Sequence, residues 1–110
     1  RGFSSRGFTV VGVYDKEPAR VGLKLDGLVV RPESELERDI HRLKPQIAVI
    51  TVPAEAAQAL VDRVTAAGIK AVLNFAPAPL TVPDGVTLRA VNMATELEIL
   101  AFTLTNGTTV

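Results

Sequence analysis

Residues 68–83 read Gly-Ile-Lys-Ala-Val-Leu-Asn-Phe-Ala-Pro-Ala-Pro-Leu-Thr-Val-Pro, and the rest of the chain is best understood outward from them. The stretch opens with a glycine of the kind that ends a helix, and its apolar run over residues 69–73 predicts a buried strand. The strand leads into a proline-punctuated loop that carries the adjacent pair Asn74 and Phe75. Such a loop is how α/β proteins present groups to a ligand.

Upstream of this stretch, the apolar pattern predicts a strand and then a helix. Residues 47–52 (Ile-Ala-Val-Ile-Thr-Val) form a buried strand that ends at Pro53, and a helix follows over residues 54–67. Strand, helix and strand in this order make a βαβ unit, whose crossover is right-handed. The segments 51–53 and 74–77 therefore emerge at the carboxyl edge of one parallel sheet, where open α/β sheets bind ligands, and Asp15 is expected at the same edge.

Near the start of the chain, residues 8–14 (Phe-Thr-Val-Val-Gly-Val-Tyr) predict a further strand, buried on both faces of a parallel sheet. The strand ends at Asp15, which has two interpretations. An acidic residue at the carboxyl end of the second strand of a dinucleotide fold can accept hydrogen bonds from ribose hydroxyls. Alternatively, Asp15 caps the helical turn that begins near Pro18, and this residue alone favours the cap.

Between these segments, the sequence predicts a loop and a short strand over residues 21–31, followed by a helix. Ser34-Glu35-Leu36-Glu37 matches a capping box, in which the Ser34 hydroxyl and the Glu37 carboxylate each accept a backbone amide. Apolar residues at helical spacing form one stripe, and Pro45 disfavours continuation of the helix beyond Lys44. The charges on this helix are read as a solvated face.

The C-terminal part predicts a strand over residues 86–91 and a last helix from Met93 to Leu104. Asn92 is placed as the N-cap of that helix. Apolar residues occur on more than one of its faces, and such a helix often needs a second surface to cover, from its own chain or from a partner.

Composition excludes several classes of function. The 110 residues contain 12 Lys and Arg against 12 Asp and Glu, which argues against nucleic-acid binding through a basic face. The absence of cysteine excludes a disulfide framework or a thiol nucleophile and fits a cytoplasmic protein. The lone His41 is read as a surface residue, so no metal site is expected. No apolar run approaches the ~18 residues of a membrane span.

Sequence patterns for catalysis and for phosphate binding are missing. There is no Gly-Lys-Ser/Thr loop, no framed pair of carboxylates and no nucleophile with its base, so no catalytic residue is assigned. There is also no Gly-x-Gly-x-x-Gly, the loop that lets backbone amides approach a pyrophosphate. The opening residues 1–7 look like a link between a helix and a strand, which suggests that the chain is a fragment.

Several of these segments together resemble the redox-sensing transcriptional repressor family Rex. The most specific is Gly68-Ile-Lys-Ala-Val-Leu-Asn-Phe-Ala-Pro. The others are Arg1-Gly-Phe, Arg6-Gly-Phe, Tyr14-Asp15 with Pro18 and Val21-Gly22, Thr51-Val52-Pro53-Ala54 with Ala57-Gln58, Val82-Pro83, Val86, Val91, and Glu96-Leu97 with Ile99-Leu100 and Phe102. The similarity extends over residues 1–106.

The resemblance implies a homodimeric bacterial repressor that senses the NADH to NAD+ ratio and is not an enzyme. Its winged helix binds operator DNA, and its Rossmann domain, an α/β fold with helices on both faces of a parallel sheet, binds NAD(H). The chain would be this domain without its first strand, glycine-rich loop and first helix, and without the winged helix. Residues 1–92 would be the partial Rossmann domain, 93–106 a dimerisation helix swapped onto the partner, and 107–110 a tail.

The resemblance also assigns residues to the cofactor. The implied cofactor-binding residues are Asp15 at the adenosine ribose, Thr51, Val52 and Pro53 along the nucleotide edge, Asn74, Phe75 and Pro77 near the nicotinamide, and Asn92 and Met93 before the last helix. The family usually has an Asp at the position of Asn92, as part of a charge switch between ligand states. Asn92 can form hydrogen bonds but carries no charge, which puts redox discrimination in question.

Two other interpretations stay open. The same Rossmann subtype, with short strands and loops that end in proline, occurs in the CoA-binding domain of acyl-CoA synthetases, where it serves an enzyme. A winged helix upstream would favour the repressor, and a downstream ligase domain with a catalytic histidine would favour the synthetase. In the third interpretation, the isolated chain binds no ligand, because it lacks the phosphate loop.

Overall fold

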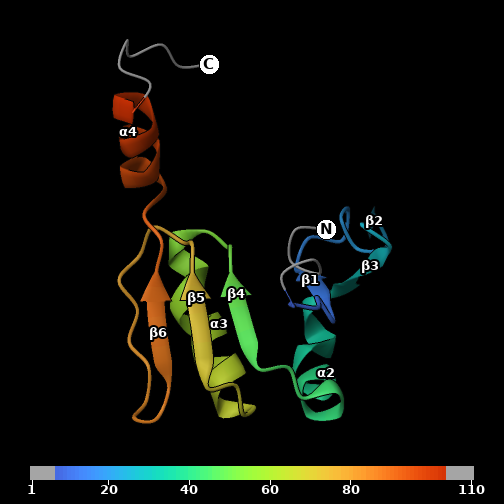
Figure 1. Ribbon diagram of the computed structural model, residues 1–110. Helices are drawn as coiled ribbons and strands as arrows, with labels where there is room; N and C mark the ends of the chain where they lie inside the picture. The colour runs from blue at the N-terminus through green and yellow to red at the C-terminus, as the bar shows by residue number, and fades with distance from the viewer. Residues whose placement is uncertain (1–6, 104–110) are drawn as a thin grey trace.

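A computed structural model describes residues 7–103 of the chain (Figure 1). The elements in order are β1 (Val13–Asp15), β2 (Lys24–Leu25), β3 (Leu28–Pro32), the short 3₁₀ helix η1 (Glu33–Glu35), α2 (Leu36–Leu43), β4 (Ile47–Ile50), α3 (Ala54–Ala66), β5 (Ala71–Asn74), β6 (Thr87–Ala90) and α4 (Met93–Thr103). The resemblance at residues 1–6, the predicted last helical residue Leu104 and the predicted tail lie outside the described part.

A parallel sheet of three strands contains the βαβ unit. Its order is β4-β5-β6, and α3 carries the chain from β4 to β5. Gly68 adopts a φ of 117° after the end of α3, a left-handed conformation that suits glycine and stops the helix. The predicted Rossmann-like α/β architecture is confirmed, and residues 68–83 occupy the middle of this sheet and the loop that leaves it.

A second small sheet precedes it in the chain. β1 pairs in parallel with β3, and β2 pairs antiparallel with β3. The β2–β3 connection consists of Asp26 and Gly27, whose φ angles are 52° and 83°. An Asp-Gly pair of this kind is the usual two-residue turn of a hairpin, so the hairpin was readable where only a loop and one strand were expected.

Strand β1 is much shorter than predicted. The expected strand over residues 8–14 was to be buried on both faces, but regular pairing begins only at Val13, opposite Val30. Phe8, Val10 and Val11 are 52%, 42% and 46% exposed. The prediction of burial was wrong because, within the described residues, β1 has a neighbour on one edge only.

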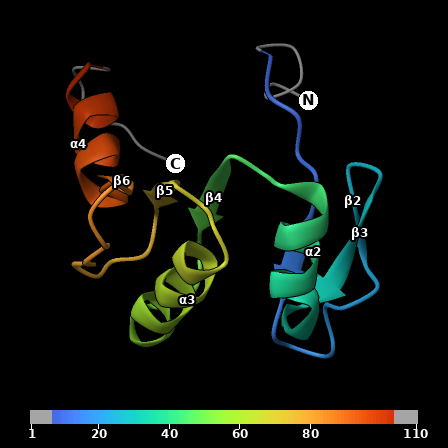
Figure 2. The ribbon, with the colours of Figure 1, turned by 90° about the horizontal axis from the view of Figure 1, so that it is seen from below.

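Helices α2 and α3 join the two sheets, which share no strand pair within the described residues. Both helices pack against one apolar core, which also takes in β4 and β5 (Figure 2). The buried core residues of this cluster are Leu36, Ile40, Ile50, Ala57, Val61, Val64, Ile69, Val72 and Ala76. Helices were expected on both faces of the sheet. Here α2 and α3 pack against the same core, through Leu36 and Ile40 of α2 and Val61 and Val64 of α3.

The N-terminal end of α2 differs from the predicted capping box. A 3₁₀ turn, η1, precedes the helix, and no side chain caps either element. The Glu37 carboxylate instead accepts two hydrogen bonds from Arg63 of α3, one from Nε at 2.6 Å and one from NH2 at 2.8 Å. A charge-assisted contact with a neighbouring helix has replaced the local cap, which is why the box was wrongly predicted.

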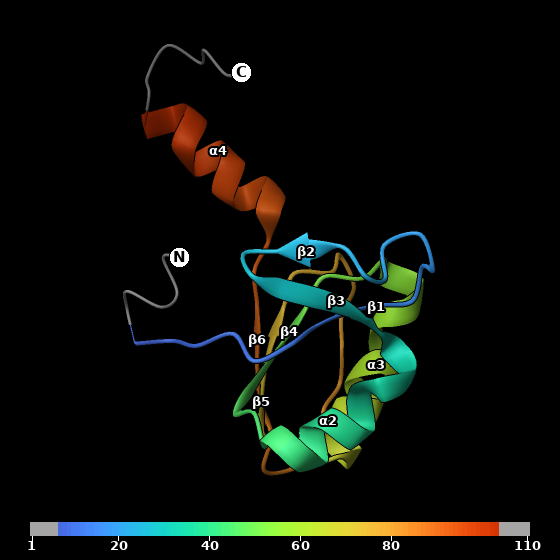
Figure 3. The ribbon, with the colours of Figure 1, turned by 90° about the vertical axis from the view of Figure 1, so that its right-hand side faces the viewer.

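Helix α4 stands beyond the carboxyl end of β6 (Figures 1 and 3). Three of its apolar side chains are exposed: Leu97 at 63%, Ile99 at 54% and Leu100 at 60%. The helix therefore presents the surplus of apolar surface that its sequence predicted.

Candidate functional site

The loops that follow β4, β5 and β6 begin side by side at one edge of the sheet (Figure 1). Ile50 pairs with Asn74, and Asn74 pairs with Ala90, so the last residues of the three strands are in register. The amide of Phe75 donates to the carbonyl of Ile50 at 2.8 Å, and that of Val91 donates to Asn74 at 2.9 Å. The structure thus brings together three of the four predicted groups of cofactor-binding residues.

The β4 loop exposes Thr51 and Pro53, while Val52 is half-buried and packs against the core. Pro53 occupies the N-cap position of α3 with a φ of −59°, and its ring makes no cap hydrogen bond. The amino end of α3, where unpaired backbone amides carry a partial positive charge, therefore opens onto the same edge.

Asn74 is the buried anchor of the β5 loop, with only 2% of its surface exposed. Its Oδ1 accepts the amide of Ala76 at 2.8 Å, and its Nδ2 donates to the carbonyl of Ala78 at 3.1 Å. Both ends of the amide are used within the loop. The loop thus presents outward the half-buried Phe75 and the exposed Pro77 and Pro79.

Gln58 fixes the far part of the same loop, a role that the sequence did not reveal. From α3, its Nε2 donates to the carbonyl of Thr81 at 3.0 Å, and its Oε1 accepts the amide of Thr81 at 3.0 Å. A side-chain amide has both a donor and an acceptor, so it can form hydrogen bonds to the carbonyl and the amide of one backbone residue, as a neighbouring strand would. In the sequence, the only indication that Gln58 matters was its place in the Ala57-Gln58 pair that resembles the Rex family.

The β6 loop places Asn92 directly before α4. Asn92 is exposed, and its carbonyl accepts the amide of Glu96 at 3.0 Å, the first hydrogen bond of the helix. This is the predicted N-cap position. Met93 begins α4, and its side chain lies outside the described part.

Asp15 lies at the end of β1, in the other sheet, so no strand pair brings it beside Thr51 or Asn74. Its Oδ1 accepts the amide of Glu17 at 2.9 Å, and its Oδ2 accepts NH1 of Arg20 at 3.2 Å. The hydrogen bond from the Glu17 amide, helped by that from Arg20 and against the effect of burial, keeps the pKa of Asp15 below its usual range. The Asp15 carboxylate is therefore ionised, and it holds the turn that follows β1, in line with the second of its two interpretations.

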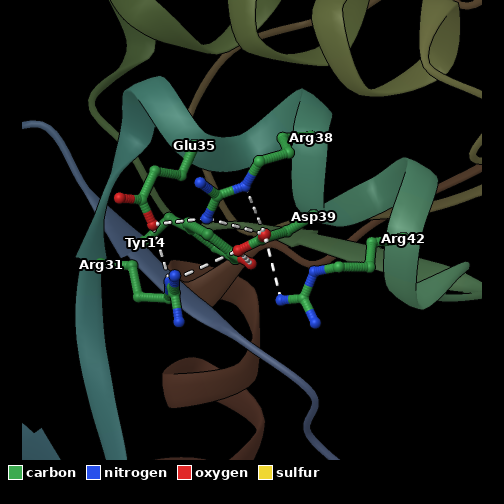
Figure 4. Close-up of polar contacts among 6 residues, drawn as sticks. All are labelled: Tyr14, Arg31, Glu35, Arg38, Asp39 and Arg42. Carbon is green, nitrogen blue, oxygen red and sulfur yellow. Dashed lines mark hydrogen bonds and ion pairs between the residues drawn. The ribbon is translucent and has the colours of Figure 1, made fainter.

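A buried carboxylate anchors β1 to α2, and sequence analysis missed it (Figure 4). Asp39 is 2% exposed, and its Oδ2 accepts the hydroxyl of Tyr14 at 2.7 Å. Three guanidinium groups surround it at 3.2 to 3.4 Å: those of Arg31, Arg38 and Arg42. Asp39 follows the apolar Leu36 by three residues, so it falls on the inward face of α2, and this spacing was the overlooked signal.

The ionisation of this pair follows from its contacts. Donation from Tyr14 lowers the pKa of Asp39 to about 2, with help from the three arginines and against the effect of burial. Burial, and then the hydrogen bond to Asp39, raise the pKa of Tyr14 to about 12. The carboxylate is charged and the phenol neutral across the ordinary pH range, so the pair acts as a fixed anchor immediately before Asp15.

A hollow on the described surface lies away from this edge. It has a volume of about 850 Å³ and lies between α2 and α3, where it reaches Ala66 and Ala67 at the opposite end of α3 from the carboxyl edge. Charges of both signs line it. Within residues 7–103, no group of three or more His, Asp or Glu side chains is arranged to hold a metal, and no helix is long and apolar enough to cross a membrane.

Comparison with known proteins identifies relatives over most of the chain. The family model described as CoA binding domain matches residues 1–78. The chain is 50% identical over 101 residues to the redox-sensing transcriptional repressor Rex of Streptomyces avermitilis, a match that covers 92% of the chain and 40% of that protein. It is 44% identical over 104 residues to Rex of Pelotomaculum thermopropionicum, covering 94% of the chain and 49% of that protein.

Solved structures agree with these sequence matches. The crystal structure of RSP, a Rex-family repressor, superposes with a TM-score of 0.85 at 35% identity and covers 96% of this chain and 50% of that one. RSP in complex with β-NAD+ and operator DNA gives a TM-score of 0.82 at 36% identity, over 94% of this chain and 48% of that one. The chain spans half the length of these relatives or less. It belongs to the CoA-binding domain family, and within that family it is similar to the redox-sensing repressors of the Rex type.

Proposed function

We propose that this chain is the nucleotide-binding and dimerisation part of a redox-sensing transcriptional repressor that responds to the NADH to NAD+ ratio. The observation that carries the proposal is the alignment of the β4, β5 and β6 loops at one edge, in a chain 50% identical to a Rex protein. Support also comes from the Rex-family neighbour RSP, whose structures hold β-NADH in one case and β-NAD+ with operator DNA in another.

The predicted cofactor-binding residues of the two sheets fit a nicotinamide dinucleotide. Asp15 is an ionised carboxylate at the carboxyl end of a parallel strand, as an acceptor for ribose hydroxyls should be. Thr51, Val52 and Pro53 would line the nucleotide. Phe75 and Pro77 offer an apolar wall for the nicotinamide, since Asn74 turns its amide inward to hold their loop. The dinucleotide would carry the redox signal, because its reduced and oxidised forms differ in the charge of the nicotinamide ring.

The proposed dimerisation segment is residues 93–106, and helix α4 (Met93–Thr103) lies within it. Its exposed Leu97, Ile99 and Leu100 need a cover, and a second copy of the chain would supply one. Asn92, placed between β6 and α4, would sit where the helix leaves its own sheet for the partner's pocket. In this arrangement each pocket is completed by the other subunit.

The regulatory mechanism would be differential affinity. Reduced and oxidised dinucleotide would favour two arrangements of the dimer, only one of which presents DNA-binding domains to an operator. The size of the response is limited by the difference in affinity between the two arrangements. Because Asn92 is uncharged where the family usually has an Asp, the difference in affinity between the two arrangements has to be measured for this protein.

Calorimetric titration of the full-length natural protein with NADH and with NAD+ tests the proposal. We expect tighter binding of NADH than of NAD+, and release of bound operator DNA on addition of NADH. The matched control is Thr9→Ala, an exposed position outside the predicted cofactor-binding residues, which should leave both affinities unchanged. Equal affinities for the two dinucleotides would contradict redox sensing.

A second candidate is supported by the family model itself, which matches residues 1–78 as a CoA binding domain. In that case the domain would serve an acyl-CoA synthetase. CoA carries a phosphate on its adenosine ribose, which the ionised Asp15 would repel, so the structure favours NAD(H). Competition between CoA and NADH for the same full-length protein separates the two, because a CoA-binding domain would lose NADH to CoA at equal concentration.

A further inference from the structure

The loop that joins β5 to β6 has few backbone donors with which to hold its own shape. It spans residues 75–86, and three of these are prolines, which have no backbone N–H: Pro77, Pro79 and Pro83. Asn74 holds the start of the loop, through its two side-chain hydrogen bonds. Residues 79–82 are held from outside the loop, by the apolar core and by α3.

The contact from α3 uses both polar atoms of the Gln58 side chain. Its Nε2 donates to the carbonyl of Thr81 at 3.0 Å and to Oδ1 of Asp62 at 2.8 Å, while its Oε1 accepts the amide of Thr81 at 3.0 Å. A carboxylate can only accept, so Asp62, one turn further along α3, fixes which end of the Gln58 amide is the donor. Gln58 is therefore already oriented when it meets the backbone of Thr81.

The residues that we assign to the nicotinamide lie between these two anchors. Phe75 follows Asn74 directly, and Pro77 lies four residues before Thr81. An apolar wall contributes fully to binding only if it is already in place, because ordering a loop on binding costs conformational entropy. The contact at Thr81 therefore bears on the nicotinamide half of the ligand. The adenosine half is assigned to Asp15, which belongs to the other sheet.

We propose that Gln58 is a positioning residue for the nicotinamide, an inference that rests on the proposed function. By holding Thr81, it keeps Phe75 and Pro77 in place for the ring, and it acts through the loop without contacting the dinucleotide. NADH and NAD+ differ only in that ring, so Gln58 also supports the discrimination between them. Binding of the adenosine half does not depend on it.

Titrations with NADH, NAD+ and ADP-ribose, which lacks the nicotinamide, test the inference on the full-length natural protein. Gln58→Met keeps the length and the helix propensity of the side chain but removes its hydrogen bonds. We expect about tenfold weaker NADH binding, because the ligand must then order the loop. The affinity for ADP-ribose should stay unchanged, and the ratio of the NADH affinity to the NAD+ affinity should fall.

The matched control makes the same chemical change at the opposite edge of the sheet. Gln46 is exposed and directly precedes β4, so Gln46→Met should leave all three affinities unchanged. Circular dichroism confirms the fold of each variant. If Gln58→Met does not fold, Gln58→Ala removes the same hydrogen bonds with the residue that most favours a helix, and it is judged by the same titrations.

The inference and the proposed function fail in different ways. A folded Gln58 variant that binds NADH as tightly as wild type would overturn the inference. So would a variant whose affinities for NADH and ADP-ribose fall by the same factor, since that is a general structural loss. In both cases NADH binding by the wild type still supports the proposed function. Wild-type protein that binds neither NADH nor NAD+ would contradict the proposed function first.

Discussion

A single buried amide holds the shape of the loop at the predicted nicotinamide end. Asn74 is the last residue of β5. Its Oδ1 accepts the amide of Ala76, and its Nδ2 donates to the carbonyl of Ala78. A carboxylate could satisfy only the first partner and an aliphatic side chain neither. The part of the loop next to β5 is therefore held by the hydrogen-bonding chemistry of Asn74, while Gln58 holds the far part.

Replacement of Asn74 should destabilise the protein. Asn74→Ala leaves a buried amide and carbonyl without their partner, which should cost about 2–3 kcal/mol in the free energy of unfolding. Urea unfolding followed by circular dichroism measures it. Pro77→Ala, an exposed change in the same loop, is the control and should stay within about 0.5 kcal/mol of wild type. Equal effects of the two substitutions would show that Asn74 is not the anchor.

The buried Asp39 makes stability depend on pH. Its pKa is lowered to about 2 from an ordinary value of 3.8, chiefly by the Tyr14 hydroxyl, so between these values the unfolded chain binds more protons than the folded one. The stability contributed by the pair is present above about pH 4 and is lost as the pH falls toward 2.

Two variants should change this loss of stability at low pH in different ways. Tyr14→Phe removes the largest cause of the lowered pKa of Asp39 and should move acid unfolding to higher pH. Asp39→Asn should flatten the dependence in part, because the pKa of Glu37 is also lowered to about 2 and titrates in the same range. Urea midpoints measured from pH 2 to pH 7 provide the test. Superimposable profiles for wild type and Asp39→Asn would refute the assignment.

Among the elements, α3 holds the loop after β5 and the η1–α2 segment in place through its polar side chains. Gln58 ties it to the loop after β5, and Arg63 ties it to the η1–α2 segment. The Arg63 guanidinium makes four hydrogen bonds, two to the Glu37 carboxylate, one to that of Glu33 and one to the Glu33 carbonyl. Because the two sheets share no strand pair within residues 7–103, this contact is one of the few polar links between them.

Arg63→Lys should weaken that link. Lysine keeps the positive charge but cannot reproduce the forked geometry, and since the side chains are partly exposed we expect a loss of about 1–2 kcal/mol in unfolding free energy. Glu37→Gln, which keeps the shape of one partner without its charge, should cost less. Chemical denaturation of the three proteins in parallel is the measurement, and a Lys variant as stable as wild type would rule out a bridging role for the fork.

For the whole molecule, the apolar surface of α4 predicts self-association. Leu97 and Leu100 are 63% and 60% exposed. We expect Leu97→Asp with Leu100→Asp to convert a dimer into a monomer, because two charges would be buried in an apolar interface. Light scattering of the full-length protein measures the mass. Leu25→Asp, a similarly exposed leucine in β2, is the control and should remain dimeric.

Much of the fold was readable from the sequence, in particular the βαβ unit over residues 47–74 and the convergence of its loops. Apolar runs, the helix-ending Gly68 and the strand-ending Pro53 act on their immediate neighbours, so their consequences are local. The length of β1 was not readable, because pairing depends on a neighbouring strand. Nor was the loss of the capping box, because Glu37 found a stronger partner 26 residues away in Arg63.

By itself, the sequence determined the βαβ unit, the parallel sheet, the edge at which Thr51 and Asn74 lie together, and the family to which the chain belongs. These follow from periodicity, from glycine and proline, and from the handedness of crossovers. Only the tertiary structure decided that Asn74 turns inward, that Asp39 is buried under Tyr14 and that Arg20 pairs with Asp15. Each of these depends on which donor meets which acceptor across packed elements or within a closed turn, and a hydrogen bond acts only at contact distance.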